Sequence, residues 1–186
     1  HAYRETLKPF YGALKSRDGD IRFAMLTGVT KFGKVSVFSD LNNLNDISMW
    51  DKYYDVCGIS EVELERDFKE DIEALAKAQG MAYGDCMARL KHMYDGYHFD
   101  AGTPGVYNPF SLLNTFAKKK FDYYWFETGT PTYLVKLLQL HNYDLNEMAN
   151  EQTSEDVLNS IDAASTNPIP VIYQSGYLTI KDYDPE

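Results

Sequence analysis

Gly28, Gly33 and Lys34 lie at the spacing G-x-x-x-x-G-K, which is typical of a loop that binds nucleotide phosphates. In such a loop a serine or threonine follows the lysine and its hydroxyl group binds magnesium, whereas this sequence has Val35. The loop must also open a helix whose first amides face the phosphates, but β-branched and turn-forming residues follow Lys34. The pattern therefore does not predict a phosphate-binding loop.

A second candidate for chemistry is the sequence YDGYHFD. Asp95 and His98 could form an acid/base pair, because a carboxylate can orient an imidazole whose pKa lies near neutral pH. The alternative is structural: Gly96 would end the preceding helix, and Tyr97 and Phe99 would anchor the loop. No serine or cysteine nucleophile motif accompanies the pair, and the four histidines show no metal-ligand spacing.

The composition argues against several function classes. The chain has 186 residues, 44% of them apolar, and a formal net charge of −10. The negative charge opposes direct nucleic-acid binding, which depends on neutralising phosphates with lysine and arginine. No apolar run is long enough to cross a bilayer, so we expect a cytoplasmic protein without a membrane partner. Cys57 and Cys86 form no C-x-x-C pair, and both are expected to be buried thiols.

The first predicted elements are a helix and a strand. Apolar residues recur at helical spacing between Tyr3 and Leu14, with Pro9 as a kink or a late start. Ile21–Leu26 is an apolar run interrupted by one arginine, which is typical of a strand buried on both faces of a parallel sheet. One helix and one strand are half of an α/β unit, so the rest of the sheet is expected upstream.

Helical patterns dominate the middle of the chain. Ser60 and Glu63 form a capping box, which predicts a helix that runs to Gly80. A further helix is predicted over residues 83–94.

Asn108 as a cap and Pro109 as the first helical residue predict another helix, which the basic run Lys118–Lys120 would close. Thr130 with Pro131 predicts the start of one more. The tail VIYQSGYLTIKDY alternates in polarity and is β-like. The side chains expected to face inward from the helix after Pro109 are Leu112, Leu113 and Phe116.

Five segments together resemble the bacterial AAA-ATPase-like family, P-loop proteins that are similar to the archaeal ATPases. The segments are FAMLTGVTKFGKVSVFSDLNNLNDIS, MYDGYHF, VYNPFSLLN, YWFETGTPTYL and IYQSGYLTIKDYD. The likeness extends over essentially the whole chain. In that family the Walker A loop and the acidic Walker B strand would lie before the first residue here, so the resemblance implies the back part of an ATPase domain.

The resemblance implies an α/β fragment joined to a mainly α lid. Residues 1–45 would be the last helix and strand of a P-loop ATPase core, and residues 46–186 a helical lid with a winged-helix-like C-terminal part and a small β element. The complete protein would use ATP and Mg²⁺, whereas this chain alone would need neither and would be inactive. Its partners would be the missing P-loop half of the domain and a C-terminal nuclease-like domain of the PD-(D/E)XK type, which family members often carry.

Thr27 is the first sensor candidate that the resemblance implies, because it stands at the carboxyl end of the strand Ile21–Leu26. A polar group there can orient the attacking water or touch the γ-phosphate. Thr30 and Lys31 stand behind it as further candidates. The alternative is that Thr27 caps the turn at Gly28.

A second sensor could come from the lid segment ETGTPTYL, through Glu127, Thr128, Gly129 and Pro131. The same residues also fit an ordinary helix start with Thr130 before the proline. No arginine occupies this motif, so the resemblance supplies no sensor arginine.

Two other functions stay open from the sequence. The chain could be an interaction module of helical and winged-helix type that acts without nucleotide, or a small hydrolase that uses Asp95 and His98. The strand that we predict near the C-terminus would have an unpaired edge, so we expect residues Tyr177–Tyr183 to be frayed or paired with another chain.

Overall fold

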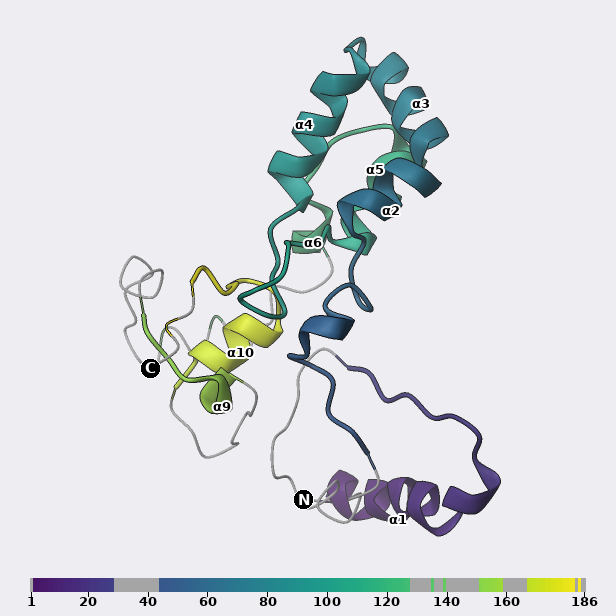
Figure 1. The fold of residues 1–186 in the computed structure, drawn as a ribbon, viewed down its shortest axis with the longest axis vertical. Helices are drawn as coiled ribbons and strands as arrows, with labels where there is room; N and C mark the ends of the chain where they lie inside the picture. Colours follow the sequence, from purple (N-terminus) through teal and green to yellow (C-terminus); the bar gives the residue numbers. More distant parts are fainter. Residues whose placement is uncertain are drawn as a thin grey trace. The chain divides into compact units, whose positions relative to one another are not determined.

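The computed structural model describes residues 2–28, 44–127, 135, 139, 151–158, 167–182 and 184, and these are mainly helical (Figure 1). The chain divides into two compact units. The first comprises His1–Ile47 and His141–Tyr177, and the second comprises Ser48–Leu140 and Leu178–Glu186. In the described part of the chain, no helix has the length and apolar character that a bilayer-spanning segment needs.

The first unit contains the helices α1 (Ala2–Ser16), α9 (Glu155–Leu158) and α10 (Ile169–Gln174) and a 3-10 turn at Asp18–Asp20. The predicted N-terminal helix is confirmed, with Pro9 inside it. α9 and α10 pack together, and the Gln174 side-chain amide donates a hydrogen bond of 2.9 Å to the Leu158 carbonyl.

The buried strand predicted at Ile21–Leu26 is not formed. These residues have no strand pairing, and Phe23 is 80% exposed, with Met25 and Leu26 also exposed. The apolar pattern predicts a strand, but a strand is held by hydrogen bonds to a neighbouring strand. The described residues contain no such neighbour, so the α/β part of the predicted fold is absent from them.

The β-like prediction for the tail is also wrong at its start, because residues 171–174 belong to α10. Pro168 caps this helix and Pro170 lies in its first turn, where the fixed φ of proline favours helix. Val171, Ile172 and Tyr173 are all buried, so the run that alternated in polarity is helical core. No strand follows within residues 177–182, so the rest of the predicted strand is not formed in the described part of the tail either.

The second unit is built on α2 (Glu61–Asp67), α3 (Lys69–Gln79), α4 (Tyr83–Tyr94), α5 (Pro109–Lys118) and the short α6 (Tyr124–Glu127). α3 packs against both α4 and α5, and α5 also packs against α6. The prediction of a helix over 83–94 is confirmed. The described residues hold only two isolated antiparallel bridges, Ile59 with Tyr107 and Tyr97 with Val106, and no β wing.

The capping box that begins α2 is confirmed. The backbone N–H of Ser60 donates to Glu63 Oε2 (3.0 Å), and the Glu63 N–H donates to Ser60 Oγ (3.4 Å). The hydrogen bond from the Ser60 N–H, and to a smaller extent the one from the Ser60 hydroxyl, lowers the pKa of Glu63 below its ordinary value. The box therefore stabilises the helix while Glu63 is ionised.

We expect Ser60→Ala to lower the free energy of unfolding by about 1 kcal/mol at neutral pH, because a cap acceptor is lost. The folded pKa of Glu63 lies below the unfolded one, so its contribution is present above the unfolded pKa and is lost as the pH falls through the folded pKa. Urea unfolding of wild type and variant across this acidic range should show the difference shrinking. An equal loss in Glu65→Ala, on the exposed face of the same helix, would contradict this assignment.

The single helix predicted from Ser60 to Gly80 is interrupted at Phe68, whose φ of −116° and ψ of 17° leave the helical region. The Phe68 ring stacks on Phe116 of α5 with 5.6 Å between centroids, so tertiary packing accompanies the break. Gly80 ends α3 with a φ of 65°, as predicted.

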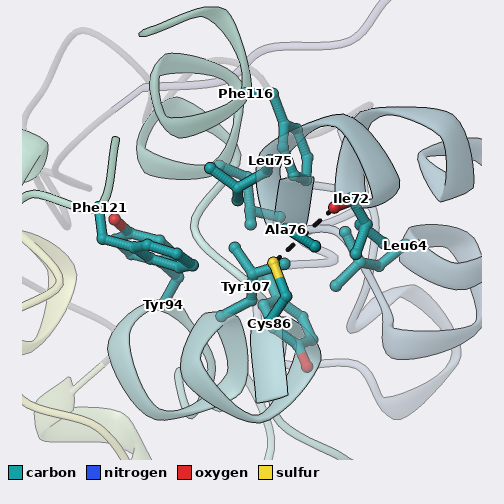
Figure 2. Packing of buried hydrophobic residues seen from close by; sticks show 11 residues of the cluster. Leu64, Ile72, Leu75, Ala76, Cys86, Tyr94, Tyr107, Phe116 and Phe121 are labelled. Atoms are coloured by element: carbon teal, nitrogen blue, oxygen red, sulfur yellow. Dashed lines mark hydrogen bonds between the residues drawn. The ribbon is translucent and has the colours of Figure 1, made fainter. Parts of the chain in front are cut away.

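One apolar core joins α2, α3, α4 and α5, and Figure 2 shows it around Cys86. The Cys86 thiol lies 3.9 Å from the Ile72 carbonyl oxygen, and burial raises the pKa of this thiol. Cys86 is thus the buried thiol that we predicted, but Cys57 is exposed, which corrects that prediction. The cluster consists of Leu64, Ile72, Leu75, Ala76, Cys86, Leu90, Tyr94, Tyr107, Leu112, Phe116 and Phe121.

α5 begins as predicted, with Asn108 Oδ1 accepting a 2.8 Å hydrogen bond from the Ser111 N–H. It ends as predicted at Lys118, and Lys119 adopts a left-handed conformation with a φ of 49°. The prediction that Leu113 faces inward is wrong, because this side chain is 51% exposed. α5 therefore has a buried face and an outward face that also carries apolar residues.

Candidate functional site

The segment between α4 and α5 contains the two motifs YDGYHF and VYNP, and backbone hydrogen bonds hold them together. The Asn108 N–H donates to the Tyr94 carbonyl (2.9 Å), and the Val106 N–H donates to the Tyr97 carbonyl (2.9 Å). These two contacts close residues 95–107 into a loop whose ends coincide with the end of α4 and the start of α5. The backbone N–H of Asn108 and the backbone carbonyl of Tyr97 therefore help to hold the two sides of this loop together.

Two glycines allow the loop to close. Gly96 has a φ of 111°, which other residues rarely adopt. A Cβ on Gly105 would lie 3.0 Å from Gly96 Cα and 3.1 Å from Asp95 Oδ1, so only glycine fits without displacing its neighbours. Gly105 carries no local sequence signal, because the constraint on it is a contact across the loop.

His98 is oriented by the loop itself. Its Nδ1 lies 2.9 Å from the Thr103 carbonyl oxygen, which can only accept, so Nδ1 carries the proton. Its backbone N–H donates to Thr179 Oγ1 at 2.7 Å. Within the described residues no hydrogen bond or ion pair joins His98 to Asp95, so the arrangement needed for an acid/base pair is not formed there.

Three buried polar atoms in these motifs have no hydrogen-bond partner among the described residues: Asp95 Oδ1, the Tyr107 hydroxyl and Ser111 Oγ. Burial raises the pKa of Tyr107 far above its ordinary value, and the nearby charges of Glu61 and Asp95 add to this effect. Tyr107 therefore stays a neutral phenol with an unused donor. Of these residues only Asp95 is a candidate from the sequence; Tyr107 and Ser111 lie in the motif VYNPFSLLN but carry no local signal of burial without a partner.

The predicted sensor residues lie mostly outside the described residues. Thr27 is described, and it is exposed in an irregular segment of the first unit. Thr30 and Lys31 are not among the described residues. The described helix α6 ends at Glu127, and Thr128, Gly129 and Pro131 fall beyond the described range. The sensor roles of all these residues stay predictions.

No metal site is evident in the part of the chain that the structure describes, where no group of three or more metal-binding side chains gathers. A shallow surface hollow is lined by Glu65, Lys69, Glu73 and Tyr83.

Comparison with known proteins finds a family match for the N-terminal end of the chain. Residues 1–38 match the sequence family described as "Predicted AAA-ATPase". A protein of Azotobacter chroococcum mcd 1, described as "Uncharacterized protein in vnfD 5'region", is 37% identical over 177 residues. That alignment covers 95% of this chain but 32% of the relative, so the chain spans about a third of that protein's length. No solved structure matches the chain significantly.

Proposed function

We propose that this chain is the sensor-and-lid part of an AAA-like P-loop ATPase, which transmits ATP binding or hydrolysis to a partner or a downstream domain. Residues 1–45 would complete the ATPase core and residues 46–186 would form the lid. The complete protein would bind ATP and Mg²⁺, and this chain alone would not bind ATP tightly, because the amide cradle for the phosphates lies elsewhere.

The observation that carries this proposal is the match of residues 1–38 to the AAA-ATPase family. The matched range includes LTGVTK, in which Thr27 follows an apolar run. At the carboxyl end of a core strand, its hydroxyl would orient the attacking water, with Lys31 near the phosphates. The lid would place four further residues near the nucleotide, namely Glu127, Thr128, Gly129 and Pro131.

The exposure of the segment Ile21–Leu26 supports the proposal. Phe23, Met25 and Leu26 are apolar and exposed, which is unfavourable in water unless another part of the protein covers them. The much greater length of the relative is consistent with additional core strands in a longer polypeptide. Such strands would pair with Ile21–Leu26 and bury these side chains.

Thr27→Val in the complete protein tests the proposal. We expect ATP turnover to fall by roughly tenfold while ATP affinity stays nearly unchanged, as for a group that acts mainly in the transition state. Thr153→Val, at an exposed threonine outside the motifs, should leave both quantities unchanged. Steady-state turnover and equilibrium ATP binding measure the two effects.

Two results would contradict the proposal. Unchanged turnover in Thr27→Val would reduce this residue to a turn former. Micromolar ATP binding by the 186-residue chain alone, abolished by Lys34→Ala, would mean that Gly28–Lys34 is a phosphate-binding loop after all.

The hydrolase alternative has less support. In the described residues the Thr103 carbonyl oxygen lies 2.9 Å from His98 Nδ1, so Asp95 is not the group that orients this imidazole, as the hydrolase alternative requires. The interaction-module alternative is favoured by the apolar side chains of Phe110 and Leu113, which are exposed on α5.

A further inference from the structure

The segment between α5 and α6, residues 119–123, is held by side chains that are distant in the sequence. Gln79 at the end of α3 donates a 2.8 Å hydrogen bond to the Lys119 carbonyl. The Tyr94 hydroxyl at the end of α4 donates to the Asp122 carbonyl (2.9 Å) and accepts from the Asp122 N–H (3.1 Å). The backbone of this short segment is therefore bound at two points, by α3 and by α4.

Aromatic contacts with α4 hold the same segment. The Phe121 ring is 7% exposed and stacks on the Tyr94 ring, with 6.4 Å between centroids and 9° between planes (Figure 2). The Arg89 guanidinium carbon lies 4.5 Å from the centroid of the Phe121 ring, where the electrons of the ring face attract a cation. α4 therefore supplies a hydroxyl group, an aromatic ring and a cation to one short segment.

The held segment leads directly into α6. Tyr124, the first residue of α6, is 2% exposed, and its hydroxyl donates to the Lys120 carbonyl (2.9 Å). The Lys118 ammonium lies 4.2 Å from the centroid of the Tyr124 ring. α6 ends at Glu127, so about one helical turn separates Tyr124 from the first of the four lid residues that we place near the nucleotide. The position of Glu127 therefore depends on the contacts that α4 makes with residues 119–123.

We propose that Tyr94 is a positioning residue for ATP turnover, which sets the place of Glu127 near the nucleotide through residues 119–123 and α6. This inference rests on the function proposed above. A shift of about 1 Å in a group that acts on the reaction can lower the rate by roughly a hundredfold, so the hydroxyl that binds both backbone groups of Asp122 should affect turnover. ATP binding depends mainly on the phosphate cradle elsewhere in the complete protein and should change little.

A double-mutant cycle in the complete protein tests this role. We expect Tyr94→Phe and Glu127→Gln each to lower ATP turnover by roughly tenfold at nearly unchanged ATP affinity. If Tyr94 acts through Glu127, Tyr94→Phe should have almost no further effect in the Glu127→Gln background. A general loss of stability would instead lower turnover by the same factor in both backgrounds. Tyr83→Phe, the same change at a 36% exposed tyrosine of α4, should leave turnover unchanged.

Two variants of Arg89 provide a second test that leaves the buried hydroxyl network intact, because this side chain is exposed. Arg89→Leu removes the cation over Phe121, and we expect turnover to fall by roughly threefold, the factor that corresponds to an exposed cation–π contact. Arg89→Lys keeps a cation at this place and should restore most of the lost turnover.

The outcomes separate this inference from the proposed function. Full turnover in Tyr94→Phe or in Glu127→Gln, or an equal effect of Tyr94→Phe in both backgrounds, overturns the positioning role and leaves the ATPase assignment standing. Wild-type turnover in Arg89→Leu, or no recovery in Arg89→Lys, also contradicts it. A complete protein that neither binds nor hydrolyses ATP overturns the proposed function, and this inference with it.

Discussion

Leu112→Ala should lower the free energy of unfolding of the second unit by about 2–5 kcal/mol. Leu112 is fully buried where α5 meets the rest of the core, so shortening it removes apolar contacts and leaves a cavity. Chemical denaturation followed by circular dichroism should show an earlier transition at an unchanged slope, since the surface exposed on unfolding hardly changes.

The adjacent Leu113→Ala is the matched control. It makes the same chemical change one residue along the same helix, but its side chain is 51% exposed. We expect its effect to stay within about 0.5 kcal/mol. Equal losses in the two variants would contradict the division of α5 into a core face and an outward face.

Tyr94→Phe should cost about 1–3 kcal/mol, although the aromatic ring is kept. The buried Tyr94 hydroxyl donates to the Asp122 carbonyl (2.9 Å) and accepts from the Asp122 N–H (3.1 Å) and from Thr115 Oγ1 (2.8 Å). Without it, two backbone groups of Asp122 lose their partner in a partly buried place, which is more costly than losing an exposed hydrogen bond. Equilibrium unfolding measures the loss.

Tyr83→Phe provides the comparison, because Tyr83 lies at the start of the same helix with a more exposed side chain. Its effect should be within about 0.5 kcal/mol. A small effect in Tyr94→Phe as well would mean that water replaces the lost hydroxyl contacts. The network would then not be what ties α4 to α5 and to the segment before α6.

Several residues in the motifs that resemble the ATPase family have structural roles, whatever their function. Asn108 caps α5, Gly96 and Gly105 close the loop, and Tyr107 lies in the core. A substitution at these positions would therefore destabilise the fold, and a loss of activity in such a variant would not identify a catalytic role. Thr27 is a cleaner functional probe, because its side chain is exposed.

Local signals in the sequence determined most helix ends in the second unit. The capping box of Ser60 and Glu63, the Asn108–Pro109 start and the Gly80 stop are all found as predicted. Each depends on groups within a few residues of one another, so hydrogen bonds and φ preferences along the chain suffice to specify it. The family resemblance is likewise a property of the sequence, although the family match is found only over residues 1–38.

Tertiary structure alone decided which apolar residues are buried. The runs Ile21–Leu26 and Val171–Gln174 both suggested strands, yet the first is exposed and unpaired and the second is a buried helix. A strand depends on a neighbouring strand that may be distant in sequence or absent, and periodicity in one segment carries no information about that neighbour. Leu112 and Leu113 differ for the same reason: the elements that pack against α5 determine which leucine enters the core and which remains outside.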